Sequence, residues 1–283
     1  MIRRLLLLVA ALAAGGLPAA RAEERIVSAA GAITEIVHAL GAGDRLVAVD
    51  TTSVYPPAVQ ALPKVGYMRA LSAEGVLSAR PTLVLLSSDA GPPQVLDQLR
   101  AAGVKLAVIE DSHDAAGVPP KIRAVAAALG MTEGGEALAR SVADTFTAIE
   151  QAIAKVPQRP RVLFVLSTGR GAPMAAGQNT AADAMIRLAG GDNAVRGYTG
   201  YKPLSSEAAA AAAPEIVLAM QQTVDQAGGA DAFMAQLKLG ATPAGRARRL
   251  VALDGSYLLG FGPRAPMAVA DLARAIHPGI ALP

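Results

Sequence analysis

The sequence predicts an α/β protein of two lobes, each with a mostly parallel central sheet covered by helices, joined by one long helix with a ligand cleft between them. Three observations predict this fold. Short apolar runs alternate with helical segments in both halves of the chain, as in parallel sheets covered by helices. A motif that begins with Gly-Tyr occurs once in each half. A long stretch of helical periodicity separates the two halves.

The first residues have the pattern of a secretory signal peptide. Arg3 and Arg4 precede the apolar run from Leu5 to Ala14, and Ala20-Arg-Ala22 is a cleavage signal of the A-x-A type. The apolar run is shorter than the ~20 residues that span a bilayer. We therefore expect residues 1–22 to be removed and the mature protein to reside in the periplasm.

An exported protein of this kind should begin near Glu23, because cleavage follows the small residue Ala22. Intact mass or amino-terminal sequencing of the periplasmic form checks this expectation. An exported form that still carries Met1 would contradict it.

Charge and composition argue against several classes of function. The chain has 26 basic and 23 acidic residues, and three of the arginines leave with the signal segment, so the mature protein has no net charge. A nucleic-acid or anionic-membrane partner would favour a basic face, which this composition does not indicate. The chain has no cysteine, which excludes thiolate metal sites and cysteine nucleophiles. Its three histidines lack metal-ligand spacing.

The β-rich runs predict the strands of both sheets. In the first lobe they are Arg25–Ala29, Arg45–Val49, Thr82–Leu86 and Lys105–Ile109, and in the second lobe Arg161–Leu166, Glu215–Met220 and Arg249–Leu253.

The stretch from Met131 to Val156 predicts the connecting helix. Thr132 is suited to cap it, Pro157 follows its end, and apolar residues recur every three or four positions. Such a helix is roughly 35 Å long and makes a poor hinge, so we expect little closure of the lobes.

The predicted divisions are a signal peptide at 1–22, an N-terminal lobe at 23–130, the connecting helix at 131–156 and a C-terminal lobe at 157–283. Clefts between two lobes are common ligand sites.

The repeated motif reads GYMRALSAE from Gly66 to Glu74 and GYKPLSSE from Gly200 to Glu207. Each copy has a cation soon after the tyrosine, a serine suited to cap a short helix, and a glutamate in the first turn of that helix. Pro81 and Pro214 end these helices before buried strands. The repeat therefore predicts two lobes of similar plan.

Several stretches resemble periplasmic haemin-binding proteins of the HmuT type, the binding components of ABC haem importers. The stretches are Val65–Glu74, Ala90–Pro93, Ala176–Thr180, Gly200–Ser205 and Leu259–Arg264, and the resemblance covers essentially the whole mature chain. It implies a monomeric protein, not an enzyme, that takes ferric haem downstream of an outer-membrane receptor and passes it to a permease dimer.

By this resemblance, Tyr67 corresponds to the axial tyrosine whose phenolate binds ferric haem iron. A free tyrosine has a pKa of about 10, so the phenolate needs the iron and a nearby cation. Arg69, two residues on in extended backbone, would point the same way and hydrogen-bond the phenolate. The alternatives are a tyrosine that packs at a strand end and an arginine that is a solvated surface charge.

In the second lobe, Tyr201 and Lys202 occupy the matching place. They would line the opposite wall and meet the porphyrin or a propionate, or else form a structural loop. Some relatives carry a histidine in the loop that corresponds to Ser167–Gly171, and this chain does not. The difference argues against a second axial ligand and against loading of two haems. Arg170 in this loop would instead face a propionate.

Two roles are open for Glu74 and Glu207. A carboxylate in the first turn of a helix favours the helix dipole by ~0.3–1 kcal/mol. In related importers, one glutamate of each lobe docks on arginines of the two membrane subunits, and the resemblance assigns Glu74 and Glu207 this role.

Enzymatic readings have little support. Gly169–Met174 follows a strand but lacks the third glycine of a dinucleotide loop, and no Ser-His-Asp arrangement or P-loop is present. The alternative function is binding of a ferric siderophore or a corrinoid in the same fold.

Overall fold

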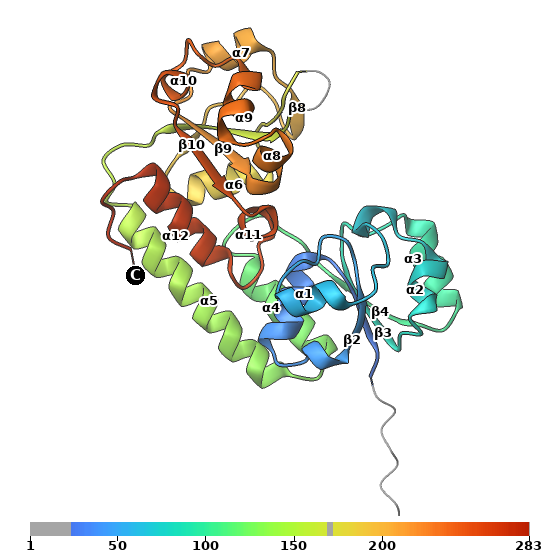
Figure 1. The fold of residues 1–283 in the computed structure, drawn as a ribbon. Coiled ribbons are helices and arrows are strands. Elements are labelled where there is room, and N and C mark those ends of the chain that lie inside the picture. Colours follow the sequence, from blue (N-terminus) through green and yellow to red (C-terminus); the bar gives the residue numbers. More distant parts are fainter. Residues whose placement is uncertain (1–23, 169–171, 283) are drawn as a thin grey trace, which may run out of the picture.

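The computed structural model describes residues 24–168 and 172–282 and has one sheet towards each end of a long helix (Figure 1). The first sheet is fully parallel, with the strand order β2-β1-β3-β4. Each strand lies within about one residue of its predicted bounds, and β3 is buried along its whole length. The strands are β1 (Ile26–Ala29), β2 (Leu46–Val49), β3 (Leu83–Ser87) and β4 (Lys105–Ile109).

The second sheet is mixed and has the order β10-β9-β5-β6-β8, with β7 beside β5. Its parallel part, β5, β9 and β10, is the predicted one, whereas β6 and β8 add antiparallel strands that were not predicted. These additions are too short to show a two-residue periodicity. The strands are β5 (Arg161–Ser167), β6 (Met174–Ala176), β7 (Asp192–Asn193), β8 (Tyr201–Pro203), β9 (Ile216–Met220) and β10 (Leu250–Leu253).

Helices flank both sheets (Figure 1). In the first lobe they are α1 (Gly31–Ala39), α2 (Ala73–Ser78), α3 (Pro93–Ala101) and α4 (Val118–Ala128). Those that follow β5 are α6 (Ala181–Leu188), α7 (Ser206–Ala211), α8 (Gln221–Gln226), α9 (Ala230–Leu237), α10 (Pro243–Ala247), α11 (Gly255–Leu259) and α12 (Ala265–Ile276). In the described part of the chain, no helix is long and apolar enough to cross a membrane.

The long helix is α5 (Thr132–Ile153), and its apolar face is buried as the periodicity predicted. The predicted cap at Thr132 is wrong. The capping position belongs to Met131, whose side chain makes no capping hydrogen bond. Gly130, with a φ of 70°, reverses the chain directly after α4, so the helix starts one residue earlier than a threonine cap would require. Thr132 is consequently inside the first turn.

The two lobes also share side-chain contacts at the start of their first strands. Arg25 lies directly before β1, and Arg161 is the first residue of β5. The Arg25 Nε atom donates to the carbonyl oxygen of Arg80 at 3.0 Å, and the Arg161 Nε atom donates to that of Ala213 at 2.9 Å. Arg80 and Ala213 have φ values of 47° and 44°, and each precedes the proline that follows the short helix. The two lobes therefore share this uncommon backbone conformation as well as their sequence motif.

One hydrophobic core runs through both lobes. It extends from β1 through α5 and α12 to one face of the second sheet, and includes Val27, Phe146, Phe164 and Leu272. A second, smaller cluster around Phe233 covers the other face of the second sheet. The lobes are thus joined by packed side chains and not only by a connecting segment.

Candidate functional site

Tyr67 and Arg69 lie between β2 and α2, where Met68–Ala70 forms a turn of 3-10 helix. Tyr67 itself is extended, but the extended backbone expected as far as Arg69 is wrong, because the 3-10 turn begins at Met68. The turn nevertheless brings the two side chains together, and Arg69 Nη1 donates to Tyr67 Oη at 2.8 Å. The tyrosine is 43% exposed. This hydrogen bond raises the pKa of Arg69, so an exposed phenol lies beside a firmly charged guanidinium.

The turn that carries this pair is held against the loop after β3. The Gly91 amide donates to the Met68 carbonyl at 3.0 Å, and the Leu71 amide donates to the Gly91 carbonyl at 2.9 Å. Arg69 also forms an ion pair with Asp89, which fixes the direction of the guanidinium. The sequence analysis missed Asp89. Its position just after a buried strand, at the carboxyl edge of the sheet, is the signal that could have identified it.

Tyr201 lies in β8 and is more enclosed than Tyr67. Its ring packs edge-on against Phe164, with 6.4 Å between ring centroids. Burial raises the pKa of Tyr201, while hydrogen bonding with the Ala182 backbone and the Thr180 side chain, together with the charge of Arg69, lowers it in part. Arg69, of the first-lobe motif, is thus among the charged groups that act on Tyr201 of the second lobe.

Lys202 is exposed, and its ammonium lies 5.3 Å from the centroid of the Tyr198 ring, within cation–π range. Arg170, the other predicted cation of this lobe, lies outside the described residues. Within residues 24–168 and 172–282, no group of three or more histidine, cysteine or acidic side chains could hold a metal ion directly.

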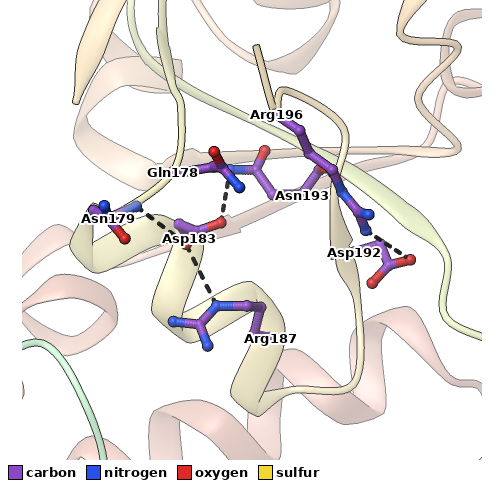
Figure 2. Close-up of a pocket in the computed structure, with 7 residues that line it drawn as sticks. All are labelled: Gln178, Asn179, Asp183, Arg187, Asp192, Asn193 and Arg196. Atoms are coloured by element: carbon purple, nitrogen blue, oxygen red, sulfur yellow. Dashed lines mark hydrogen bonds and ion pairs between the residues drawn. The ribbon is translucent and has the colours of Figure 1, made fainter. Parts of the chain in front are cut away.

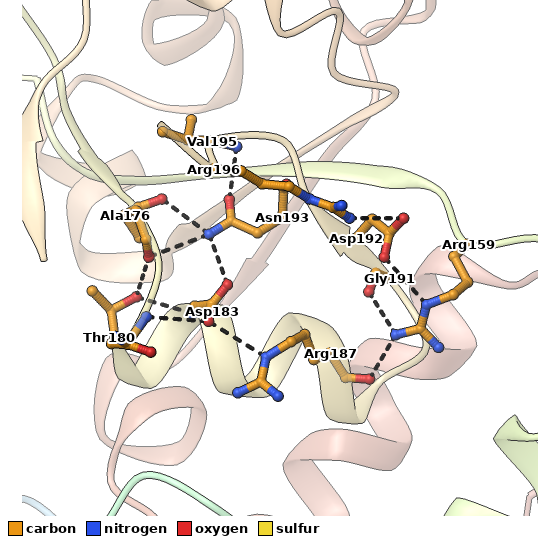
Figure 3. A network of polar contacts seen from close by, with 12 residues as sticks. Arg159, Ala176, Thr180, Asp183, Arg187, Gly191, Asp192, Asn193, Val195 and Arg196 are labelled. Atoms are coloured by element: carbon orange, nitrogen blue, oxygen red, sulfur yellow. Dashed lines mark hydrogen bonds and ion pairs between the residues drawn. The ribbon is translucent and has the colours of Figure 1, made fainter. Parts of the chain in front are cut away.

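A buried polar network supports the wall that carries Tyr201 (Figure 3). Asn193, only 4% exposed, donates through Nδ2 to the Ala176 carbonyl at 3.2 Å and to Asp183 Oδ1 at 3.0 Å. The Asp183 amide donates to Thr180 Oγ1, which caps α6. Because Ala176 pairs with Tyr201 in the sheet, the network holds β6 and the start of α6, two of the elements that Tyr201 contacts. No sequence motif marks Asn193, since its partners come from separate elements.

Beside this network is a polar pocket of about 430 Å³ (Figure 2). The residues that line it are Gln178, Asn179, Asp183, Arg187, Asp192, Asn193 and Arg196. Its charges are paired, with Arg187 Nε 3.4 Å from Asp183 Oδ2 and Arg196 Nη2 3.0 Å from Asp192 Oδ2. Neither tyrosine of the repeated motif lines it, so this pocket is separate from the candidate site.

Glu74 and Glu207 are exposed in the first turns of α2 and α7. The predicted serine caps are confirmed, because Ser72 and Ser205 each accept a hydrogen bond from the backbone amide three residues on. Hydrogen bonds from its own amide and from Ser205 lower the pKa of Glu207. The two carboxylates therefore occupy equivalent places, one on each lobe.

Comparison with known proteins identifies the family. A sequence profile described as periplasmic binding protein matches residues 26–257. The periplasmic haem-binding protein RhuT from Roseiflexus sp. RS-1, in apo form, is 45% identical, with 90% of this chain and 98% of that chain covered and a TM-score of 0.87. The periplasmic haem-binding protein BhuT in complex with two haems is 49% identical, with 91% and 99% covered and a TM-score of 0.85.

A vitamin B12-binding protein from Yersinia pestis (strain Pestoides F) is 35% identical over 94 residues, which cover 33% of this chain and 34% of that protein. These relatives are binding proteins of transport systems and not enzymes. The resemblance to haem-binding proteins of the HmuT type is confirmed by the structures of RhuT and BhuT. The chain belongs to the periplasmic binding protein family, as a substrate-binding protein of the ABC importer type.

Proposed function

We propose that the protein captures ferric haem through the phenolate of Tyr67 and delivers it to an ABC transporter for uptake. The observation that carries this proposal is the exposed Tyr67 hydroxyl, which accepts a hydrogen bond of 2.8 Å from the Arg69 guanidinium. The haem-binding relatives, which match this chain over nine tenths of its length, support the choice of ligand.

The chemistry of the pair suits a ferric iron ligand. The Arg69 guanidinium can donate the same hydrogen bond to a phenolate that binds iron, because the phenolate oxygen keeps a lone pair for it. Asp89 holds the other end of the Arg69 guanidinium, so that Nη1 remains directed at Tyr67. An anionic oxygen ligand stabilises Fe(III) relative to Fe(II), which suits capture outside the cytoplasm.

The facing lobe would contact the porphyrin. Tyr201 is partly enclosed, its hydroxyl interacts with the start of α6, and its burial raises its pKa, so it is less suited than Tyr67 to bind iron as a phenolate. We assign Tyr201 to contact with the porphyrin ring and the exposed Lys202 to a propionate. Arg170 is the other candidate for a propionate.

Corrinoid binding has one observation in its favour, the match to vitamin B12-binding proteins. The sequence match covers 33% of this chain, and a solved vitamin B12-binding protein of Vibrio cholerae that matches 89% of it is only 24% identical and shows the fold alone. The haem-binding relatives are 45% and 49% identical over about nine tenths of the chain. We therefore prefer haem. Titration of the purified mature protein with haemin should give a saturable ferric spectrum, and the absence of saturation would contradict the proposal.

Replacing Arg69 with alanine should weaken haemin binding about tenfold. A charge-assisted hydrogen bond contributes ~1.5–3 kcal/mol, and part of that free energy is already present before haemin binds, so only the remainder is lost from the affinity. The charge-transfer band of the iron-bound tyrosinate should shift but remain, since Tyr67 is still present. Spectral titration measures both effects. The matched control is Arg100→Ala, which removes an exposed arginine that pairs with Asp97 on α3. An equal loss in both variants would contradict a specific role for Arg69.

A further inference from the structure

The segment that follows β10 leaves the second lobe and contacts the first. In Figure 1, α11 lies between the two lobes, and α12 then runs beside α5. At the junction of α11 and α12, Arg264 donates two hydrogen bonds to Glu35 of α1, from Nε at 2.9 Å and from Nη2 at 2.6 Å. The Glu35 side chain is 7% exposed. A bidentate ion pair with a buried carboxylate and a partly exposed guanidinium therefore joins the lobes through residues far apart in the sequence.

Aromatic rings enclose the arginine of this pair. The guanidinium carbon of Arg264 lies 3.5 Å from the centroid of the Tyr55 ring, in the first lobe, and 5.1 Å from that of Tyr257, in α11. Tyr257 donates a hydrogen bond of 2.8 Å to Asp271 of α12, which holds its ring in place. Both contacts are within cation–π range. The Arg264 guanidinium thus contacts one ring of the first lobe, Tyr55, and one ring of the segment after β10, Tyr257.

A buried lysine of the first lobe also holds the segment that follows β10. The Lys121 ammonium of α4, with a side chain 1% exposed, donates to the Phe261 carbonyl at 3.1 Å and pairs with Asp111. Phe261 is fully buried, and its φ of 49° turns its backbone towards the first lobe. At Gly262, a Cβ atom would lie 3.4 Å from the Ala32 Cα atom, so the backbone passes close to α1.

These contacts are costly to break. Burial raises the pKa of Glu35, and the hydrogen bond and charge of Arg264 offset part of that rise. Separating the lobes at this point would break both hydrogen bonds of the pair and the contact of Arg264 with the Tyr55 ring, and only water would replace them. The segment after β10 is therefore a second attachment between the lobes, in addition to α5.

We propose that the Glu35–Arg264 pair is an interlobe latch that fixes the separation between the Tyr67 and Tyr201 walls of the site. Both residues of the latch are positioning residues, because they act on the ligand only through the placement of the walls. Because the two lobes are attached to each other at two places, through α5 and through the latch, they should keep one relative arrangement in the absence of ligand. The inference concerns the free protein and does not depend on haem being the ligand.

Distance measurement between spin labels tests the latch directly. The chain has no cysteine, so labels attach only at introduced positions, and Gln98→Cys on α3 with Ala235→Cys on α9 places one exposed label on each lobe. In the ligand-free protein with an intact latch, we expect a narrow distribution of distances. The double variant Glu35→Gln/Arg264→Gln removes both charges without leaving either one unpaired. It should shift and broaden the distribution while circular dichroism stays unchanged.

The matched control is Arg123→Gln, which breaks another two-bond arginine–glutamate pair, with Glu136, that does not involve α1 or the segment after β10. It should leave the distance distribution narrow. Arg264→Lys, which keeps the charge but loses the bidentate geometry, should give an intermediate result. An unchanged distribution in the double glutamine variant, or equal broadening in the Arg123→Gln control, would overturn the latch, whatever the protein binds.

Discussion

Replacing Tyr67 with phenylalanine should abolish the tyrosinate-to-iron charge-transfer band and lower the affinity for haemin on the order of a hundredfold. The substitution keeps the ring and removes only the oxygen that we assign to the iron. Because the side chain is 43% exposed and its hydroxyl bonds to the exposed Arg69, the free energy of unfolding should hardly change. Absorption titration with haemin measures the band and the affinity together.

Two further tyrosine variants make this result specific. Tyr198→Phe is the matched control, because the Tyr198 hydroxyl makes only long hydrogen bonds, of 3.3 and 3.4 Å, to backbone carbonyls of the second lobe. It should leave the band intact. Tyr201→Phe should weaken binding and keep the band. If the band survives in Tyr67→Phe and is lost in Tyr201→Phe, the iron ligand is Tyr201 and the assignment of Tyr67 is wrong.

The double variant Glu74→Gln/Glu207→Gln should bind haemin normally yet fail to drive haem uptake or to stimulate the ATPase of its transporter. The two carboxylates are exposed, one on each lobe, so their charges act on recognition by the transporter and not on the fold. Both serine caps remain, and the melting temperature should therefore change little. Transport by the unmodified protein should also weaken as salt concentration rises.

The control for this variant removes two comparable carboxylates elsewhere. Glu133 and Asp231 are exposed acids in the first turns of α5 and α9, so Glu133→Gln/Asp231→Asn has a similar effect on helix dipoles without touching the repeated motif. Transport should persist in the control. Undiminished transport in the Glu74/Glu207 variant would mean that these residues only stabilise helices and that the docking surface lies elsewhere.

Local sequence patterns predicted the parts of the fold that depend on local forces. The buried strands β3 and β9 are continuous apolar runs, and the prolines after α2 and α7 mark the ends of the helices that precede them. The contact between Arg69 and Tyr67 was also predicted, although for a different backbone. The backbone leaves the extended conformation after Tyr67 and forms a 3-10 turn at Met68–Ala70, which a motif alone does not reveal.

Contacts between distant segments could not be predicted. Asp89 reaches Arg69 from the next loop of the sheet, and Asn193 joins β6 to α6. The pair of Glu35 and Arg264 spans most of the mature chain. Nothing in the sequence around these polar groups indicates their partners, and only the folded chain brings each partner near. The repeat pointed to two similar lobes, but not to the latch that joins them.

The most direct test of the central claim is a parallel titration of the purified mature protein with haemin, cyanocobalamin and a ferric siderophore. The protein should give a saturable change with haemin alone, with a ferric spectrum that includes the tyrosinate charge-transfer band. Saturable binding of cobalamin or siderophore, with no saturable change on addition of haemin, would contradict it.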